Sequence, residues 1–380
     1  MIMKRYLLTI AILLSSISAI AAPKVSLLTC GPTDDYVFYL YGHTAIRVQQ
    51  DGQDIVYNYG YFSLDQKNFI LNFMLGKPMY SLGVTSFDEF LWEYSSQGRS
   101  VVEQELNLTD TEALLLANKL SWNALPENRD YQYNFYFDNC ATRPRDLLEE
   151  AIGDIKYQLN PSALPTFREA IRDKSHSAVW YTMGADLCLG WKTDRQMSLR
   201  DAAFLPSYLE QELDSALRGD TNEPIVTKKV VWVEQSKTIS NPYEAWRIPW
   251  FVFVILIVLL QIRPTSKIQI LYHRAIYTLL GIGGVTIWFL AFISEHPHTW
   301  PNANMLFMHP FWFVLAITTY NKRWGKPNKW LYFGNFVAIV IYLILGLFLQ
   351  ELPKHLHILA IGIALDQFLR WRESRNHIEE

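Results

Sequence analysis

The sequence has little of what marks several common classes of protein. Its formal net charge is only −3 over 380 residues, and a chain without a basic excess is poorly suited to bind nucleic acid. It contains no nucleotide-binding loop, internal repeat or low-complexity tract. We therefore expect no nucleotide cofactor and no other cofactor.

Cysteine is scarce, with only Cys30, Cys140 and Cys188 in the chain. In an oxidising compartment an odd number leaves at least one thiol free. A Cys30–Cys188 disulfide would leave Cys140 free, whereas a Cys30–Cys140 disulfide would exclude Cys140 as a nucleophile. The sequence pattern allows both pairings.

Histidine provides only weak metal signals. Four histidines lie on the same predicted outer face of the C-terminal region, and we interpret them as solvated histidines at a membrane interface rather than as metal ligands. No metal site is therefore predicted. These histidines are His296, His298, His355 and His357.

Long apolar runs are absent from the first part of the chain and concentrated after Trp246, although 50% of all residues are hydrophobic. The apolar segments are residues 250–262, 276–293, 305–319, 331–349 and 358–369. The second and fourth are long enough to cross a membrane alone, and the others are short. Loops rich in Lys and Arg alternate with loops that carry only Lys354. The positive-inside rule then predicts five spans with Trp246 outside and Glu380 in the cytoplasm.

The first 22 residues have the pattern of a secretory signal, with Lys4 and Arg5 before an apolar core and small residues at 18–22. An uncleaved anchor is the alternative, although the apolar core is shorter than a membrane span requires. The next domain is therefore expected outside the cytoplasm. The predicted organisation is a signal peptide at 1–22, an outer domain at 23–235, a linker at 236–249, a transmembrane domain at 250–370 and a cytoplasmic tail at 371–380.

The outer domain is predicted to be α+β, because antiparallel strands alternate with helices. The strands are expected at 24–30, 45–48, 55–62, 77–84, 100–106, 131–137 and 227–233. The helices are expected at 87–95, at 109–125, from about 141 onwards and at 205–218.

Cys140 lies where an aromatic strand is predicted to turn into an amphipathic helix, which Asp138 or Asn139 can cap. A cysteine at a helix N-terminus is close to the positive end of the helix dipole, which favours the thiolate. Free N–H groups of the first turn can also bind an oxyanion. We therefore expect a depressed thiol pKa at Cys140. The structural alternative is a small buried cysteine.

His43 starts a strand that leads into an Asp-Gly hairpin. If that dipeptide is a two-residue turn, Gln50 pairs with Gln53 and His43 lies opposite Gly60. His43, Asn58 and Gly60 then share one face, because side chains alternate along a strand. Asn58 can orient the imidazole there, and Gly60 leaves room for the ring. A slip of one residue would move Asn58 to the other face, and a lone strand histidine is more often structural.

These stretches together resemble the Lnb-type lipoprotein N-acyltransferases, and more distantly the permuted NlpC/P60 and lecithin:retinol acyltransferase-like thiol enzymes. The motifs are LLTCGP at 27–32, YGHTAIRV at 41–48, YNYG at 57–60, DNCATRPRD at 138–146 and a His-Pro…Asn-x-Asn loop at 296–304. The resemblance implies a permuted papain-like periplasmic domain followed by about five transmembrane helices. It also implies that His43 is the base, that Cys140 is the nucleophile and that Cys30 lies near the site.

By this resemblance the protein is a membrane-bound acyltransferase of the bacterial inner membrane. Cys140 would take an acyl chain from a phospholipid as a thioester and pass it to the amino group of a diacylglyceryl-cysteine lipoprotein. Arginines near the motifs can meet lipid phosphate, or else form salt bridges or lie on a solvated surface. The predicted catalytic residues are Cys140, His43 and Asn58, and the predicted lining residues are Cys30, Tyr41, Arg47, Asn139, Arg143 and Arg145.

Two other functions fit the same residues. One is an envelope cysteine peptidase or amidase that cleaves cell-wall peptide and would work without the apolar helices. The other is a non-enzymatic membrane receptor or assembly factor, in which Cys140 and His43 are structural and tolerate conservative changes.

Overall fold

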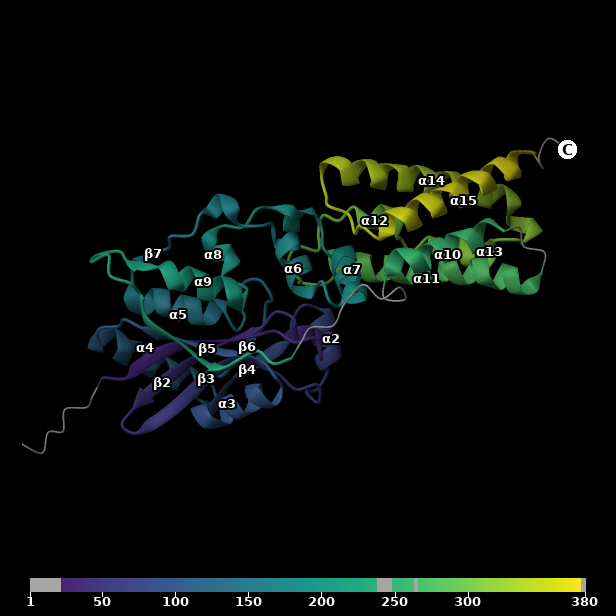
Figure 1. The fold of residues 1–380 in the computed structure, drawn as a ribbon. Coiled ribbons are helices and arrows are strands. Elements are labelled where there is room, and N and C mark those ends of the chain that lie inside the picture. Colours follow the sequence, from purple (N-terminus) through teal and green to yellow (C-terminus); the bar gives the residue numbers. More distant parts are fainter. Residues whose placement is uncertain (1–21, 238–247, 263–265, 377–380) are drawn as a thin grey trace, which may run out of the picture.

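The computed structural model describes residues 22–237, 248–262 and 266–376. The predicted signal peptide and most of the predicted linker lie outside the described residues. Figure 1 shows an N-terminal domain of strands and helices and, end to end with it, a bundle of C-terminal helices. This is the α+β domain followed by a helical region that the sequence predicts.

The N-terminal domain is built on a seven-stranded antiparallel sheet with strand order β6-β4-β3-β2-β1-β5-β9. All the strands except β6 agree with the prediction to within a few residues, because alternating apolar residues give each strand one buried face. The strands are β1 (Lys24–Cys30), β2 (His43–Gln50), β3 (Gln53–Tyr61), β4 (Met79–Ser86), β5 (Val101–Leu106), β6 (Asp130–Gln132) and β9 (Val226–Val233).

The strand predicted at 131–137 is wrong beyond Gln132, where β6 ends. The chain turns instead at Asn134, whose side-chain oxygen accepts hydrogen bonds from the backbone N–H groups of Tyr136 and Phe137, both at 3.1 Å. Asn side chains stabilise turns in this way, and here they override the strand tendency of the aromatic residues. The turn brings the chain directly to Cys140.

Helices cover both faces of the sheet. On one face α3 (Phe87–Ser96) packs its buried aromatic residues against Leu28, Ala45 and Val56. The other face is covered by α4 (Asp110–Asn123), α5 (Thr142–Ile152) and α9 (Pro206–Ser215). Capping boxes start α3 and α4, at Ser86 and Thr109.

The rest of the N-terminal domain consists of short elements. Of these, α6 and α7 lie next to the C-terminal helices in Figure 1. The elements are η1 (Val37–Tyr39), α2 (Phe69–Met74), β7 (Ile155–Lys156), η2 (Pro161–Ala163), α6 (Phe167–Ser175), α7 (Val179–Cys188), η3 (Trp191–Asp194), α8 (Leu199–Ala202) and β8 (Leu217–Arg218).

Among the described residues, two C-terminal helices are long and apolar enough to cross a membrane, α11 (Lys267–Phe292) and α14 (Gly325–Phe348). They correspond to the second and fourth apolar segments of the sequence. The third segment is not one continuous helix, because the chain between α12 and α13 contains Pro310, which lacks a backbone donor. The other helices are α10 (Pro249–Gln261), α12 (Asn304–Phe307), α13 (Trp312–Thr318), η5 (Lys322–Trp324) and α15 (Leu356–Asn376).

The two loops poor in charge both contact the N-terminal domain. The loop after α11 accepts a hydrogen bond from Gly190 N at His298 O, at 2.7 Å, and the loop after α14 places the Gln350 amide 3.2 Å from Leu189 O. At the other end of the bundle the Arg370 guanidinium lies 5.2 Å from the ring of Tyr320. The two loops poor in charge therefore lie at the same end of the bundle, and the five-span topology stays a prediction.

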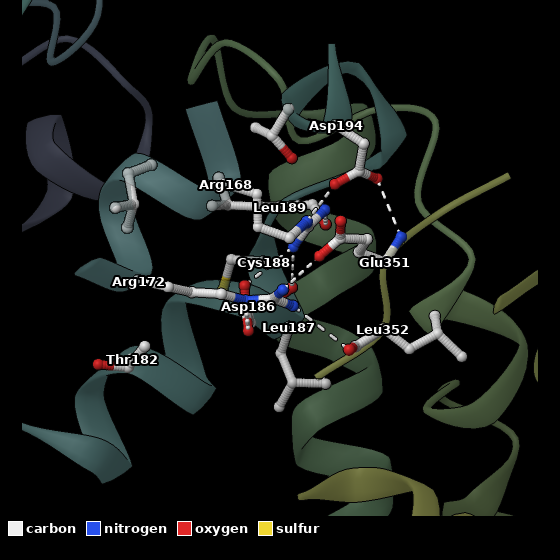
Figure 2. Close-up of polar contacts among 12 residues, drawn as sticks. Arg168, Arg172, Thr182, Asp186, Leu187, Cys188, Leu189, Asp194, Glu351 and Leu352 are labelled. Carbon is white, nitrogen blue, oxygen red and sulfur yellow. Dashed lines mark hydrogen bonds and ion pairs between the residues drawn. The ribbon is translucent and has the colours of Figure 1, made fainter. Parts of the chain in front are cut away.

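A network of paired charged side chains connects the N-terminal domain to the C-terminal bundle (Figure 2). Arg168 on α6 is fully buried and pairs with Asp186 at 3.0 Å and with Asp194. Arg172 bridges from Asp186, at 2.8 Å, to Glu351 on the loop after α14. Arg172 and Asp194 thereby connect the N-terminal domain to the loop after α14, where Glu351 N also donates to Asp194 at 3.1 Å. We call this network the junction.

Candidate active site

The hairpin that carries the histidine has the predicted register. Gln50 pairs with Gln53, and Asp51 and Gly52 both have positive φ, 52° and 78°. That conformation belongs to the tight turns whose twist matches antiparallel strands. The turn therefore determines which residues of β3 can reach His43.

Asn58 holds the His43 ring, as the register predicts. The Nε2 atom of His43 is hydrogen-bonded to Asn58 Oδ1. An amide oxygen only accepts, so Nε2 carries the proton and Nδ1 is left as the basic nitrogen. The ring of Tyr94 from α3 stacks on the imidazole with centroids 6.2 Å apart.

Gly60 lies between the histidine and the cysteine. A Cβ atom placed on it would be 3.6 Å from the Cys140 Cβ and 3.6 Å from the His43 Cε1. Space alone would allow that atom, but φ at Gly60 is 106°, a region that favours glycine, at an irregularity in the β3–β4 pairing. The structure thus brings His43 and Cys140 to the same corner of the sheet.

Cys140 lies in the turn two residues before the start of α5, and Asn139 shapes that turn. The Asn139 Oδ1 accepts from the backbone N–H groups of Ala141 and Thr142, at 2.8 and 2.9 Å, while its Nδ2 donates to Phe135 O and Phe204 O. The predicted N-cap at Asp138 or Asn139 is wrong, because the N-cap of α5 is Ala141. Asn139 nevertheless accepts from the N–H groups at that end of the helix, and Asp138 pairs with an arginine. The expectation of free first-turn N–H groups is therefore wrong for these two groups.

The expectation of a depressed thiol pKa is also wrong. Burial raises the pKa of Cys140 to about 11, although the backbone N–H groups of Thr44 and Cys140 and the charge of Arg99 lower it. Burial likewise lowers the pKa of His43 to about 4, although the hydrogen bond that His43 donates to Asn58 raises it. Both side chains keep some accessible surface, but protein atoms surround them densely. The resting pair is therefore a neutral thiol beside a neutral imidazole.

Cys30 lies directly opposite His43 in the β1–β2 pairing and is buried. Burial raises the pKa of its thiol far above the ordinary range. Cys30, Cys140 and Cys188 are all free thiols, so neither of the two disulfides considered above is present.

Arg99 is a residue of this corner that the sequence did not indicate. It is 1% exposed, its Nε donates to Gly31 O at 2.7 Å, and its guanidinium lies 4.6 and 4.7 Å from the rings of Tyr39 and Tyr94. Its Nη2 has no hydrogen-bond partner, and no carboxylate among the described residues pairs with it. In the sequence it is one arginine in a loop before a strand, so no motif could have identified it.

The other predicted lining residues have partners of their own. The Tyr41 hydroxyl is 3.1 Å from that of Tyr181, Arg47 pairs with Glu103 at 3.0 Å, and Arg145 pairs with Asp146 at 2.7 Å. Contact of these arginines with lipid phosphate stays a prediction.

Arg143 lines a hollow in the surface of the N-terminal domain. It pairs with Asp138 and stacks on the Tyr131 ring at 3.7 Å. The hollow has a volume of about 380 Å³ and is lined by Tyr59, Asn123, Phe137, Asp138, Arg143, Asp146, Leu147 and Glu150. Cys140 is not among these residues, so the hollow is beside the site rather than within it.

Comparison with protein families gives two matches that together cover most of the chain. Residues 17–173 match the model of the Lnb N-terminal periplasmic domain. Residues 234–372 match the model of the Lnb transmembrane domain. No curated protein and no solved structure matches the chain.

Proposed function

The chain belongs to the Lnb family of membrane proteins with a periplasmic and a transmembrane domain, and on that premise we propose that it is a lipoprotein N-acyltransferase. The observation that carries the proposal is the placement of Cys140 beside His43, which Asn58 orients. A thiol next to an oriented imidazole supplies the nucleophile and the base that acyl transfer through a covalent intermediate requires.

In the first step Nδ1 of His43 takes the proton from the Cys140 sulfur as the sulfur attacks the ester carbonyl carbon of a phospholipid. The tetrahedral intermediate collapses, the C–O bond breaks, and His43 returns the proton to the departing oxygen of the lysophospholipid. Because both groups are neutral at rest, proton transfer accompanies attack instead of preceding it.

In the second step the α-amino group of a diacylglyceryl-cysteine lipoprotein attacks the thioester carbonyl carbon. His43 takes a proton from the nitrogen, the C–S bond breaks, and the proton returns to the sulfur of Cys140. The products are an N-acylated lipoprotein and the enzyme in its starting state. No metal or cofactor is needed to balance either step.

We assign the same organisation as above to the whole chain. Residues 1–22 are the signal peptide, 23–235 the periplasmic domain, 236–249 the linker, 250–370 the transmembrane domain and 371–380 a cytoplasmic tail in the bacterial inner membrane. Support comes from the loops after α11 and α14, which contact the periplasmic domain, and from α15, which ends at the remote end of the bundle in Figure 1. Reporter fusions after Lys329 and after Pro353 should report opposite sides, and the same side for both would refute five spans.

Acyl transfer is tested with purified protein in vesicles that contain phospholipid and a diacylglyceryl-lipopeptide. We expect the lipopeptide to gain one acyl chain by mass, and Cys140 to carry a hydroxylamine-sensitive acyl group when lipopeptide is omitted. Cys188→Ala is the matched control, since it removes another partly exposed thiol. Cleavage of a cell-wall peptide without lipopeptide acylation would favour the peptidase or amidase instead. Absence of both activities would favour a receptor or assembly factor.

A further inference from the structure

An apolar surface patch lies on α2 and the two loops beside it. On the six-residue helix α2 the side chains of Ile70, Leu71, Phe73 and Met74 are all exposed, with Ile70 at 71%. A soluble domain rarely displays so many large apolar side chains together unless something covers them. We define the α2 patch as Tyr36, Val37, Phe38, Leu64, Ile70, Leu71, Phe73 and Met74.

Ring contacts make the patch continuous. Phe62 is 5.3 Å from Phe38 and 5.5 Å from Phe69, measured between ring centroids, and Phe69 is 6.3 Å from Phe73. The segment around η1 and the helix α2 therefore belong to one surface, although about thirty residues separate them in the chain.

The patch lies at the outer end of a membrane-spanning helix. Directly after α11, Ser294 Oγ donates to Met74 O at 2.7 Å and His296 Nε2 lies 2.7 Å from Phe73 O. The last apolar residues of that span, Phe292 and Ile293, are themselves 58% and 62% exposed. The patch thus continues the lipid-facing surface of α11, and Figure 1 places α2 on the side of its domain that faces the bundle.

The patch also leads to the cysteine. Phe62 and Phe69 contact the ring of Tyr80, at 4.9 and 6.4 Å, and Tyr80 stacks on Tyr133 at 4.2 Å. Burial and then the nearby Cys140 raise the pKa of Tyr80 to about 12, and the same two causes raise the pKa of Tyr133. Phe62, Tyr80 and Tyr133 each keep some accessible surface. Phe62 also follows Gly60 by two residues, and a Cβ atom on Gly60 would be 3.6 Å from the Cys140 Cβ. The row of rings therefore leads from the patch to the corner that holds Cys140.

We propose that the α2 patch is immersed in the outer leaflet of the membrane, and that the row of rings behind it guides a phospholipid acyl chain to Cys140. The second half rests on the proposed acyl transfer, whereas the first half does not. A lipid surface fits better than a protein partner because the patch adjoins the lipid-facing end of α11 and carries the aromatic and aliphatic side chains typical of membrane-interface segments.

The first test is photo-crosslinking in vesicles of phosphatidylethanolamine and phosphatidylglycerol, with benzoylphenylalanine placed at position 70 or 73. The control position is Trp92, which is also apolar and 73% exposed but lies on α3, away from the bundle in Figure 1. We expect phospholipid adducts at 70 and 73 and few at 92. Equal labelling at all three positions, or crosslinks to protein instead of lipid, would refute immersion. The crosslinking can also be done in the Cys140→Ala variant, which lacks the proposed nucleophile, so its result does not depend on catalysis.

The second test compares two acyl donors in the double variant Ile70→Asp, Phe73→Asp. With phospholipid in vesicles the rate of acylation should fall by about tenfold or more, since charged residues oppose insertion at an interface. With a dissolved short-chain phospholipid it should stay close to that of the unchanged protein. Trp92→Asp should affect neither. An equal loss with both donors would contradict the proposal. If the unchanged protein were inactive with both donors, the proposed acyl transfer would be refuted, and the crosslinking result would still decide whether the patch is immersed.

Discussion

The junction and the corner of the sheet that holds His43 and Cys140 each bury an arginine, but the two surroundings differ. At the junction Arg168 is neutralised by Asp186 and Asp194, and its remaining N–H groups donate to backbone carbonyls at 2.9 and 3.1 Å. At the corner the Arg99 guanidinium contacts two tyrosine rings and donates hydrogen bonds to one backbone carbonyl and to the side-chain oxygen of Gln97. Its Nη2 has no hydrogen-bond partner.

A buried charge without a counter-ion costs stability, so its presence calls for a reason. The Arg99 charge lowers the pKa of Cys140, against the larger effect of burial, which raises it. It also lowers the pKa of His43, in the same direction as the larger effect of burial. It therefore favours the thiolate and any anion formed at the site. The junction uses charge to hold two domains together, whereas the corner keeps one charge unbalanced near the Cys140 thiol.

If the proposed function is right, the largest effect should come from replacing Cys140 or His43 at the corner. Cys140→Ala and His43→Ala should each reduce N-acylation to background, because they remove the nucleophile or the base. Cys140→Ser should do the same, because a hydroxyl is a poor nucleophile for a base suited to a thiol. The double variant should be no worse than either single one, since both groups act in one step. Mass spectrometry of a reporter lipoprotein, with membrane protein level measured beside it, gives the readout. Full activity of His43→Ala would leave the histidine a structural role.

Two matched variants, Arg168→Met and Arg99→Met, test whether the two buried arginines have different roles. Loss of Arg168 leaves two carboxylates without their buried partner and should cost about 3–5 kcal/mol of unfolding free energy. Loss of Arg99 leaves no buried carboxylate behind and should cost less stability, but it should slow acyl transfer. Thermal unfolding in detergent and the acylation rate separate the two. Equal destabilisation by both variants, with Arg99→Met fully active, would mean that Arg99 has a structural role like that of Arg168.

A smaller effect is expected from Asn58→Ala. The variant frees Nε2 of His43 without removing the base, so the rate should fall about tenfold to a hundredfold, as for other orienting groups. The kcat for lipopeptide acylation is the quantity to measure, because binding of the lipids should change little. A loss as complete as that of His43→Ala would mean that Asn58 does more than orient the ring.

The mildest test varies only pH. With the Cys140 pKa at about 11, alkylation by iodoacetamide should rise about tenfold per pH unit between pH 7 and 9, because only the thiolate reacts. With the His43 pKa at about 4, the imidazole stays neutral above that value, so acylation should decline only as the pH falls towards 4 and the base becomes protonated. Alkylation that levels off below pH 8.5 would instead restore the depressed thiol pKa expected from the helix terminus.

Much of the site could be predicted because its parts are local in the chain. Asp51 and Gly52 fix the hairpin turn, and the turn sets the register that brings Asn58 to His43. The apolar segments and the alternation of basic loops likewise follow from composition, and α11 and α14 are the two spans that stand alone by length. The prediction of a strand through Asn134 failed because a side-chain hydrogen bond outweighed an aromatic pattern.

The sequence by itself determined the α+β domain, the helical region after it, the hairpin and the position of Cys140 before α5. Only the tertiary structure decided the state of the thiol, because the pKa depends on how many protein atoms replace water around the sulfur. The same holds for Arg99 and for the contact of α2 with the end of α11, which join segments far apart in the chain. Burial and contact between distant segments are properties of packing, and no local pattern of residues records them.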